Sequence, residues 1–285
     1  MPTPRILIHG GASSRFWRNG DDVRNRAHRG LAAACAAGGA VLGGGGNALD
    51  AAVAAVRVLE DDPLFNAGTG AVRTSAGTLE LDAALMCGAT ARCAAICGVT
   101  RLLNPIDGCR RMLDQGKPVF MWGPHAERRC LELGAAERHG DGPRPAEEHA
   151  AGTVGAVALD AQGRLAAATS TGGIAGKLPG RIGDSPVIGA GTWADAGCAV
   201  SCTGDGELFI RLGLARSLAH ASGTAAAAGD LLAQVDRLGG MGGLIALRAD
   251  GGMVADVTGA DIARGWWTAD GGCVTGLNDG DPWPE

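Results

Sequence analysis

The sequence contains no tyrosine, and aromatic residues make up only 4% of its 285 residues. The absence of tyrosine excludes a phenolic group as a catalytic acid, base or nucleophile. The chain also has no basic run, and 25 lysines and arginines against 30 aspartates and glutamates leave a formal net charge of −5. Because nucleic-acid binding is driven largely by clustered positive charge, no nucleic-acid partner is expected.

Long hydrophobic runs are missing as well. The first apolar stretch, Ile6 to Ile8, is too short for the core of a secretory signal peptide. The uncharged stretch from Gly30 to Leu49 holds many glycines and few large apolar side chains, which is not typical of a membrane span. We therefore expect a cytoplasmic protein that has no membrane partner.

The nine cysteines include no CxxC pair, and the spacing of Cys87, Cys93 and Cys97 matches no common zinc pattern. Thiols stay reduced in the cytoplasm. We therefore expect reduced, buried, structural cysteines, with neither disulfides nor a zinc site.

Glycine is abundant, with 49 residues, while hydrophobic residues make up 46% of the chain and charged residues 19%. This balance is typical of a globular protein with many tight turns, and the length suits one large domain or two small ones.

Hydrophobic periodicity and turn residues predict a layered arrangement of helices and strands. A stretch rich in charged and small residues, 134–152, is expected to be an exposed linker. Helices are predicted at 22–42, 47–59, 105–114, 207–221 and 224–237, and strands at 5–8, 78–82, 119–122, 153–159, 165–170 and 199–202, with hairpin turns at 160–163 and 250–252.

Thr153 stands where this linker meets a buried strand, and it directly follows Gly152. A threonine hydroxyl needs a nearby base to act as a nucleophile. Cleavage before Thr153 would supply one, because a free α-amine has a pKa of about 7.7–8.0. The alternative is a strand that simply begins with threonine.

Two further groups of residues are suited to a small substrate. Arginine binds carboxylates well, and aspartate binds ammonium groups. A turn that brings Arg181 and Asp184 into one pocket would therefore recognise a free amino acid. The alternative is that these two residues form a surface ion pair. The Thr203 hydroxyl and the Gly204 N–H could stabilise an oxyanion, or Thr203 could simply cap the next helix.

Six motifs follow one another along the chain: IHGGA at 8–12, PLFNAGTGAV at 63–72, GTVGAVA at 152–158, TSTGG at 169–173, LPGRIGDSP at 178–186 and SCTGDGE at 201–207. In these motifs, and over about Ile6 to Trp267, the chain resembles the plant-type L-asparaginases/isoaspartyl peptidases. This family is a branch of the N-terminal nucleophile hydrolases.

The resemblance implies an α+β fold, namely a four-layer αββα sandwich of the N-terminal nucleophile hydrolase type, formed by residues 1–285 as a single domain. It also implies cleavage between Gly152 and Thr153. An α subunit, 1–152, and a β subunit, 153–285, would then assemble as (αβ)2.

The resemblance also implies roles for individual residues. Thr153 is the nucleophile, which Thr171 tunes and Asn66 orients. Arg181 and Asp184 anchor the α-carboxylate and α-amine of the substrate, and Thr203 and Gly204 form the oxyanion hole. No cofactor is required for the chemistry, but a structural sodium ion is expected on the backbone carbonyls of Leu59, Glu60, Asp62, Phe65, Ala67 and Thr69.

The implied reaction is hydrolysis of L-asparagine to L-aspartate and ammonia, and of β-aspartyl (isoaspartyl) dipeptides, through a threonyl acyl-enzyme. The linker is short for this family, the segment between Trp193 and Cys198 is one residue shorter than in close relatives, and the tail 270–285 has no evident counterpart. Two alternatives remain: a glycosylasparaginase-type amidase, and a non-catalytic protein that binds a small molecule on the same fold.

Overall fold

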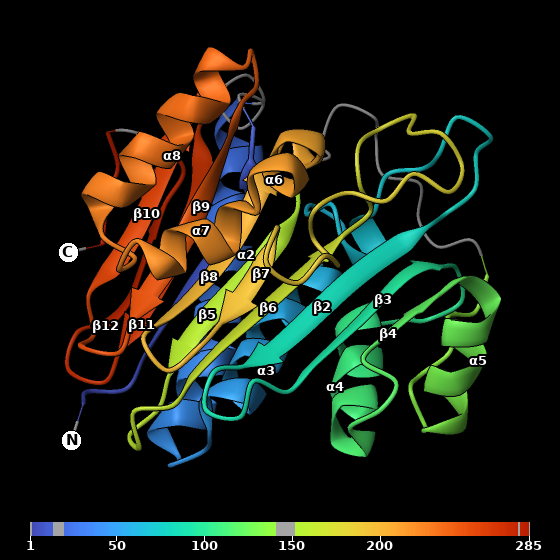
Figure 1. Ribbon diagram of the computed structural model, residues 1–285, viewed down its shortest axis with the longest axis horizontal. Helices are drawn as coiled ribbons and strands as arrows, with labels where there is room; N and C mark the ends of the chain where they lie inside the picture. Colours follow the sequence, from blue (N-terminus) through green and yellow to red (C-terminus); the bar gives the residue numbers. More distant parts are fainter. Residues whose placement is uncertain (1, 14–19, 141–151, 279, 285) are drawn as a thin grey trace.

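Two β-sheets pack face to face in the computed structural model, which describes residues 2–13, 20–140, 152–278 and 280–284 (Figure 1). Of the strand pairs in the sheets, only β3 and β4 pair in parallel; the other pairs are antiparallel. The larger sheet has the order β12 (Gly272–Gly276), β11 (Ile262–Thr268), β1 (Arg5–Ala12), β5 (Val154–Leu159), β6 (Leu165–Thr171), β2 (Leu81–Cys87), β3 (Cys93–Val99) and β4 (Phe120–Trp122). The smaller sheet has the order β10 (Met253–Thr258), β9 (Gly242–Arg248), β8 (Cys198–Gly204) and β7 (Thr192–Ala194).

Helices cover the outer face of each sheet (Figure 1). The larger sheet carries α2 (Gly20–Gly43), α3 (Ala48–Asp61), α4 (Pro105–Gln115) and α5 (Gly123–Glu132); the smaller carries α6 (Gly206–Leu212), α7 (Leu214–His220) and α8 (Ala225–Arg237). A short 3-10 turn, η1, spans Gly68–Gly70. The expected α+β class is therefore confirmed. Among the residues described, no helix has the length and apolar character needed to cross a membrane.

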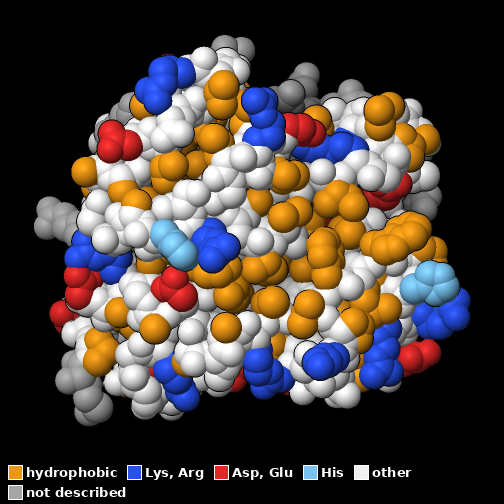
Figure 2. All heavy atoms as spheres, in the orientation of Figure 1, with side chains coloured by type: hydrophobic (Ala, Val, Ile, Leu, Met, Phe, Trp, Pro, Cys, Tyr) orange, Lys and Arg blue, Asp and Glu red, His pale blue; other side chains and the backbone are white. Residues whose placement is uncertain are grey.

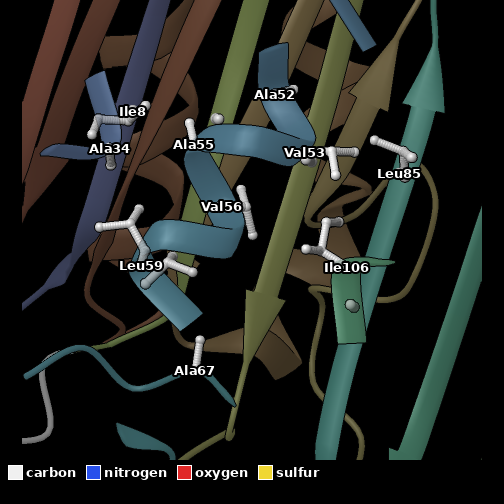
Figure 3. Close-up of a cluster of buried hydrophobic side chains, with 14 of the residues drawn as sticks. Ile8, Ala34, Ala52, Val53, Ala55, Val56, Leu59, Ala67, Leu85 and Ile106 are labelled. Carbon is white, nitrogen blue, oxygen red and sulfur yellow. The ribbon is translucent and has the colours of Figure 1, made fainter. Parts of the chain in front are cut away.

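The hydrophobic core follows the alternation of side chains along the strands. On β1, Ile6 and Ile8 pack against the helices of the larger sheet, whereas Leu7 points into the layer between the two sheets. Figure 3 shows Val53 of α3 and Leu85 of β2 pointing toward one another in the helix-side layer. Each sheet is thus apolar on both faces, which keeps its strands buried.

The helix α3 forms because its start and end are both encoded locally. The Asn47 side chain accepts a hydrogen bond of 2.9 Å from the Asp50 N–H, as an N-cap does. The helix ends at Asp61, just before Asp62 and Pro63, because proline cannot continue it. The predicted helix is confirmed, and it holds the following loop against the sheet that carries the site.

Several predicted boundaries are wrong. The helix expected at 207–221 is two helices, because Gly213 adopts a left-handed conformation with φ 56° between them. The strand expected at 5–8 continues to Ala12, since β5 and β11 pair with it on both sides and a bulge follows His9. The strand expected at 78–82 begins only at Leu81. The helix α5 carries no strong cap signal and was not expected.

The linker is shorter than expected. The Leu103 N–H donates to the Ala136 carbonyl at 3.0 Å and the Arg138 N–H donates to the Arg101 carbonyl at 2.7 Å. Residues 134–138 therefore pack against the loop before α4, because backbone pairing compensates for their lack of large apolar side chains. Residues 141–151 lie outside the described part of the chain.

All nine cysteines are free thiols. Most are buried, but Cys87 and Cys93 are half-buried and Cys273 is exposed. The expectation of buried thiols therefore holds only in part.

The C-terminal tail packs onto the fold through the buried Arg264. Its guanidinium donates to the carbonyls of Asn278 at 3.0 Å and Pro282 at 3.1 Å, and it lies 3.5 Å from the centre of the Trp283 ring. The tail also supplies β12, which pairs with β11. It therefore satisfies the polar groups of a buried arginine, which would otherwise be costly to bury.

Replacing Leu85 with alanine should destabilise the protein by about 2–5 kcal/mol, because the side chain is fully buried and its removal leaves a cavity. Urea unfolding measures this loss. The matched control is Leu178→Ala, where the side chain is 73% exposed and the change should stay within about 0.5 kcal/mol. Equal stabilities of the two variants would contradict the described core.

Candidate active site

Thr153 lies directly before β5, at an end of the larger sheet, and its side chain is largely buried. It opens onto a pocket of about 170 Å³ between the two sheets. The lining residues come from β1, β6, β8 and the loops beside them; they are Ala12, Gly152, Thr153, Thr171, Gly173, Ile174, Arg181, Gly183, Asp184, Ser185, Thr203, Gly204, Asp205 and Met241.

The Thr153 hydroxyl donates a hydrogen bond of 3.0 Å to the Thr171 hydroxyl at the end of β6. The same Thr171 oxygen accepts the Gly173 N–H at 2.9 Å. Asn66 holds this turn from the other side, because its side-chain Nδ2 donates to the Gly173 carbonyl at 2.6 Å and its main-chain carbonyl accepts the Gly172 N–H at 3.0 Å. Asn66 thus acts on Thr153 through the turn that positions Thr171.

Thr203 stands opposite Thr153 at the end of β8. Its hydroxyl oxygen accepts the Ala12 N–H at 3.1 Å, so the hydroxyl proton remains available for donation into the pocket. The following Gly204 has a φ of +148° and lies against Gly242, where a side chain would come within 2.5 Å of the Gly242 Cα. Thr203 lies on a strand and not at a helix N-cap, which removes the capping alternative.

Gly11 and Gly152 lie in close contact. A side chain on Gly11 would come within 2.5 Å of the Gly152 nitrogen and 2.7 Å of its carbonyl atoms, and Gly11 has a φ of +107°. Glycine is the residue that permits both this conformation and this approach. The IHGGA motif therefore makes room for the peptide bond that precedes Thr153.

Arg181 enters the pocket with its guanidinium already oriented. Its Nε donates to one carboxylate oxygen of Glu207 at 2.9 Å and its Nη2 donates to the other at 2.7 Å. This pair is bidentate, and the Arg181 side chain is only 15% exposed. Arg181 pairs with Glu207 and not with Asp184, so the alternative of a surface ion pair between Arg181 and Asp184 is excluded.

Asp184 is the most unusual group in the pocket. Its side chain is buried, and Oδ2 has no hydrogen-bond partner. Burial raises the pKa of Asp184 to about 7, although Arg181 partly opposes this shift. Gly206 and Gly191 make room for this carboxyl, because a side chain at either position would lie within 2.8 Å of one of its oxygens. A buried oxygen without a hydrogen-bond partner is costly, and a perturbed carboxyl in a pocket is a candidate functional group.

The residues expected to bind sodium run from the last turn of α3, which holds Leu59 and Glu60, through the following loop to Thr69 in η1. The Phe65 carbonyl accepts the Ala67 N–H at 2.8 Å, and the Asp62 carbonyl accepts the Phe65 N–H at 3.2 Å. A side chain at Gly68 would come within 2.5 Å of the Glu60 carbonyl oxygen. The carbonyls of Asp62 and Phe65 thus already accept hydrogen bonds within the segment, and Gly68 leaves room for the carbonyl of Glu60. In the described ranges, no group of three or more His, Cys, Asp or Glu residues could hold a metal ion.

The structure brings together the predicted Thr153, Thr171, Thr203, Gly204, Arg181 and Asp184, and it places Asn66 directly behind them. Sequence reasoning missed the role of Glu207 in orienting Arg181, the close approach of Gly11, and the pocket-lining Ile174 and Met241. Glu207 and Gly11 belong to motifs already singled out, but nothing local indicates what they contact.

Comparisons with known proteins show the family to which the chain belongs. A model of the asparaginase family matches residues 2–141 and 134–276, so the similarity extends beyond Trp267 into the tail. An isoaspartyl peptidase of Escherichia coli is 40% identical over 95% of this chain and 95% of its own. An isoaspartyl peptidase/L-asparaginase of Bos taurus and one of Homo sapiens are each 36% identical over 98% of this chain and 97% of their own. With matches of this extent, the chain belongs to the Asparaginase_2 family of asparaginases.

Proposed function

We propose that this protein is a self-processing amidohydrolase that hydrolyses L-asparagine and β-aspartyl dipeptides, with Thr153 as the nucleophile. The observation that carries the proposal is the placement of Arg181 and the unpartnered, buried carboxyl of Asp184 in the same pocket as the Thr153 hydroxyl. The names of the similar proteins, isoaspartyl peptidase and isoaspartyl peptidase/L-asparaginase, support the same activity.

The pocket suits the head group of a free amino acid. The substrate ammonium supplies the partner that Asp184 Oδ2 lacks, and the substrate carboxylate binds the donors of Arg181 that Glu207 leaves free. L-asparagine and β-aspartyl peptides both carry this head group. Their reactive side-chain carbonyl then faces the other residues of the pocket, Thr153 and Thr203.

Cleavage between Gly152 and Thr153 activates the nucleophile. In the uncut chain the Thr153 nitrogen is part of a peptide bond and cannot accept a proton. After cleavage it is an α-amine with a pKa of about 7.7–8.0, suited to accept the hydroxyl proton near neutral pH. The products are an α subunit, 1–152, that ends in the linker, and a β subunit, 153–285, that begins with the nucleophile.

The reaction is an acyl transfer in two steps. The Thr153 oxygen attacks the side-chain carbonyl while its proton passes to the α-amine. Ammonia, from L-asparagine, or the second amino acid, from a β-aspartyl dipeptide, then leaves with that proton. Water then attacks the acyl-enzyme and releases L-aspartate. The Thr203 hydroxyl and the Gly204 N–H stabilise the oxyanion in both steps, and Thr171 holds the Thr153 oxygen in place.

The wider architecture fits the same proposal. The two sheets and their helices form the αββα sandwich of the N-terminal nucleophile hydrolases, and two cleaved units assemble as (αβ)2. Figure 2 shows hydrophobic side chains spread over the face that carries α6 and α7, where Val187, Ile188 and Ile210 line a shallow groove. A second copy would cover such a surface.

A sodium ion would stabilise the loop after α3 and takes no part in the acyl transfer. The backbone carbonyls of Leu59, Glu60, Asp62, Phe65, Ala67 and Thr69 would hold it. Two glycines, Gly68 and Gly70, support this fit, because they allow the carbonyls of Glu60 and Phe65 to approach closely. Carbonyl oxygens are ligands that hard cations prefer.

No observation favours the two alternatives. A glycosylasparaginase would use the same machinery on a bulkier substrate, whereas the similar proteins named above are isoaspartyl peptidases. A non-catalytic binding protein would not need a threonine hydroxyl held beside an oxyanion donor. Assays on glycosylated asparagine and on a β-aspartyl dipeptide separate the two enzymes.

Thr153→Ala should abolish both self-cleavage and hydrolysis, because it removes the hydroxyl that attacks in both reactions. Intact-mass measurement on incubated wild-type protein should show fragments 1–152 and 153–285, and the variant should stay whole. Thr153→Ser, which keeps a hydroxyl, is the matched control and should still cleave. A processed and active alanine variant would show that Thr153 is not the nucleophile.

Gly11→Ala should slow self-cleavage about 10²-fold, because its side chain would displace Gly152 and a misplacement of about 1 Å costs that much in rate. The rate is followed by electrophoresis of the two fragments. Gly45→Ala is the control, since Gly45 also has a positive φ, 80°, but has no neighbour within 4 Å. Equal cleavage of the two variants would show that the contact of Gly11 with Gly152 does not determine the rate.

The KM for L-asparagine should rise about tenfold as the pH falls from 8 to 6. Only ionised Asp184 binds an ammonium, and burial places its pKa at about 7, so the carboxyl is mostly charged at pH 8 and mostly protonated at pH 6. Protonation of the Thr153 amine over the same range removes the base, and this lowers kcat instead of raising KM. Steady-state kinetics over this range separate the two effects.

Asp184→Asn is the control for that pH dependence. It should have a high KM that no longer changes between pH 6 and 8. Because burial makes the ionised carboxylate unfavourable, the variant should be at least as stable as the wild type at pH 8. A KM in the wild type that is flat over this range would remove Asp184 as the ammonium anchor.

A further inference from the structure

A row of buried polar side chains crosses from the larger sheet to the smaller one behind the proposed nucleophile. His9 Nε2 lies 2.9 Å from Ser201 Oγ, Ser201 Oγ lies 2.7 Å from Thr169 Oγ1, and Thr192 Oγ1 lies 2.6 Å from Thr169 Oγ1. All four side chains are fully buried. Such groups are costly to bury unless they are hydrogen-bonded to one another, and neither the proposed reaction nor the apolar core explains their presence.

The first end of this row lies against the strand that begins directly after the nucleophile. His9 is on β1 opposite Gly155 of β5, two residues after Thr153. Burial lowers the pKa of His9 to about 3, and the main chain of Thr153 lies close enough to the ring to oppose this shift partly. His9 is therefore a neutral imidazole that lies against Gly155 near the start of β5, and the reacting hydroxyl donates to Thr171.

The other end of the row reaches the substrate anchor. The Thr192 hydroxyl lies 3.0 Å from the Ser185 carbonyl, next to Asp184 in the chain. The Gly191 N–H, beside Thr192, donates to the Asp184 carbonyl at 3.1 Å. The row therefore runs from the start of β5, two residues after Thr153, to the loop that holds the Asp184 carboxyl.

Gly155 is the residue that lets the row pass between the strands. A side chain at this position would lie 2.0 Å from Ser201 Oγ and 2.5 Å from His9 Nε2. Its φ is not in the left-handed region, so backbone conformation does not require glycine there. The absence of a side chain at 155 serves the hydrogen bond between His9 and Ser201.

We propose that His9, Ser201, Thr169 and Thr192 are positioning residues that set the distance between the Thr153 nucleophile and the Asp184 anchor. The inference rests on the proposed function, since it takes both of those roles as given. Apolar contact between the sheets is non-directional and permits small sliding movements, whereas a row of hydrogen bonds has a defined length and direction. The row of hydrogen bonds therefore keeps Thr153 and Asp184 at a fixed distance from each other.

Thr169→Val tests this, because it keeps the shape of the side chain and removes the central hydroxyl. In cleaved protein assayed with a β-aspartyl dipeptide, kcat should fall about 10–100-fold while KM changes less than about threefold, since the head-group pocket itself is intact. Thr169→Ser restores a hydroxyl and should recover most of kcat. Thr90→Val, on an exposed turn, is the control for the substitution and should match the wild type.

The outcomes are distinct. A folded Thr169→Val with wild-type kcat, or with a raised KM and unchanged kcat, would overturn the positioning role and leave the proposed function standing. If Thr169→Val does not fold, Thr192→Val at the far end of the row takes its place. We expect the same fall in kcat for Thr192→Val, and an unchanged kcat would overturn the positioning role. A wild type that neither cleaves itself nor hydrolyses the dipeptide overturns the proposed function, and this inference with it.

Discussion

The candidate site depends on the register between the two sheets. Thr153 and Thr171 belong to the larger sheet, whereas Thr203 belongs to the smaller one and Asp184 to the loop that leads into it. Hydrophobic packing brings the sheets together, but a difference of a fraction of an ångström matters to acyl transfer and little to apolar contact. Directional bonds across the interface, such as that from the Ala12 N–H to Thr203, remove this freedom.

The two charged anchors are prepared in opposite ways. Arg181 is held by Glu207, which is 63% exposed, so the pair adds little stability but fixes the plane of the guanidinium. Of the donors of the guanidinium, Nε and one on Nη2 are engaged, and the others remain for a ligand. Asp184 is instead buried with Oδ2 unpartnered, at a cost to folding that a bound ammonium would offset in the proposed function. The burial of Asp184 therefore makes folding less favourable, at the one residue that would bind the ammonium in the proposed function.

Capping residues, prolines and turn glycines correctly predicted the helix starts and hairpin turns in which they lie. The cap at Asn47, the proline at 105 and the turn glycines Gly163 and Gly251 mark helix starts and hairpins that the structure contains. The errors fall where distant contacts override composition, as in residues 134–138, which pair with the loop before α4. A glycine in a helical pattern was equally ambiguous, because Gly213 breaks a helix whereas Gly38 and Gly39 lie inside one. Packing against neighbours decides between these outcomes, and no local pattern describes it.

The sequence by itself determined which chemical groups are present and in what order: a threonine after Gly152, an arginine and an aspartate three residues apart, and a threonine and glycine at the end of a strand. Short motifs carry this information because each spans only a few residues. Only the tertiary structure decided which groups meet. The contact of His9 with Ser201 spans 192 positions and that of Ala12 with Thr203 spans 191, so both exist only once two sheets have packed face to face. That packing results from apolar surface spread over the whole chain, which specifies no individual pair.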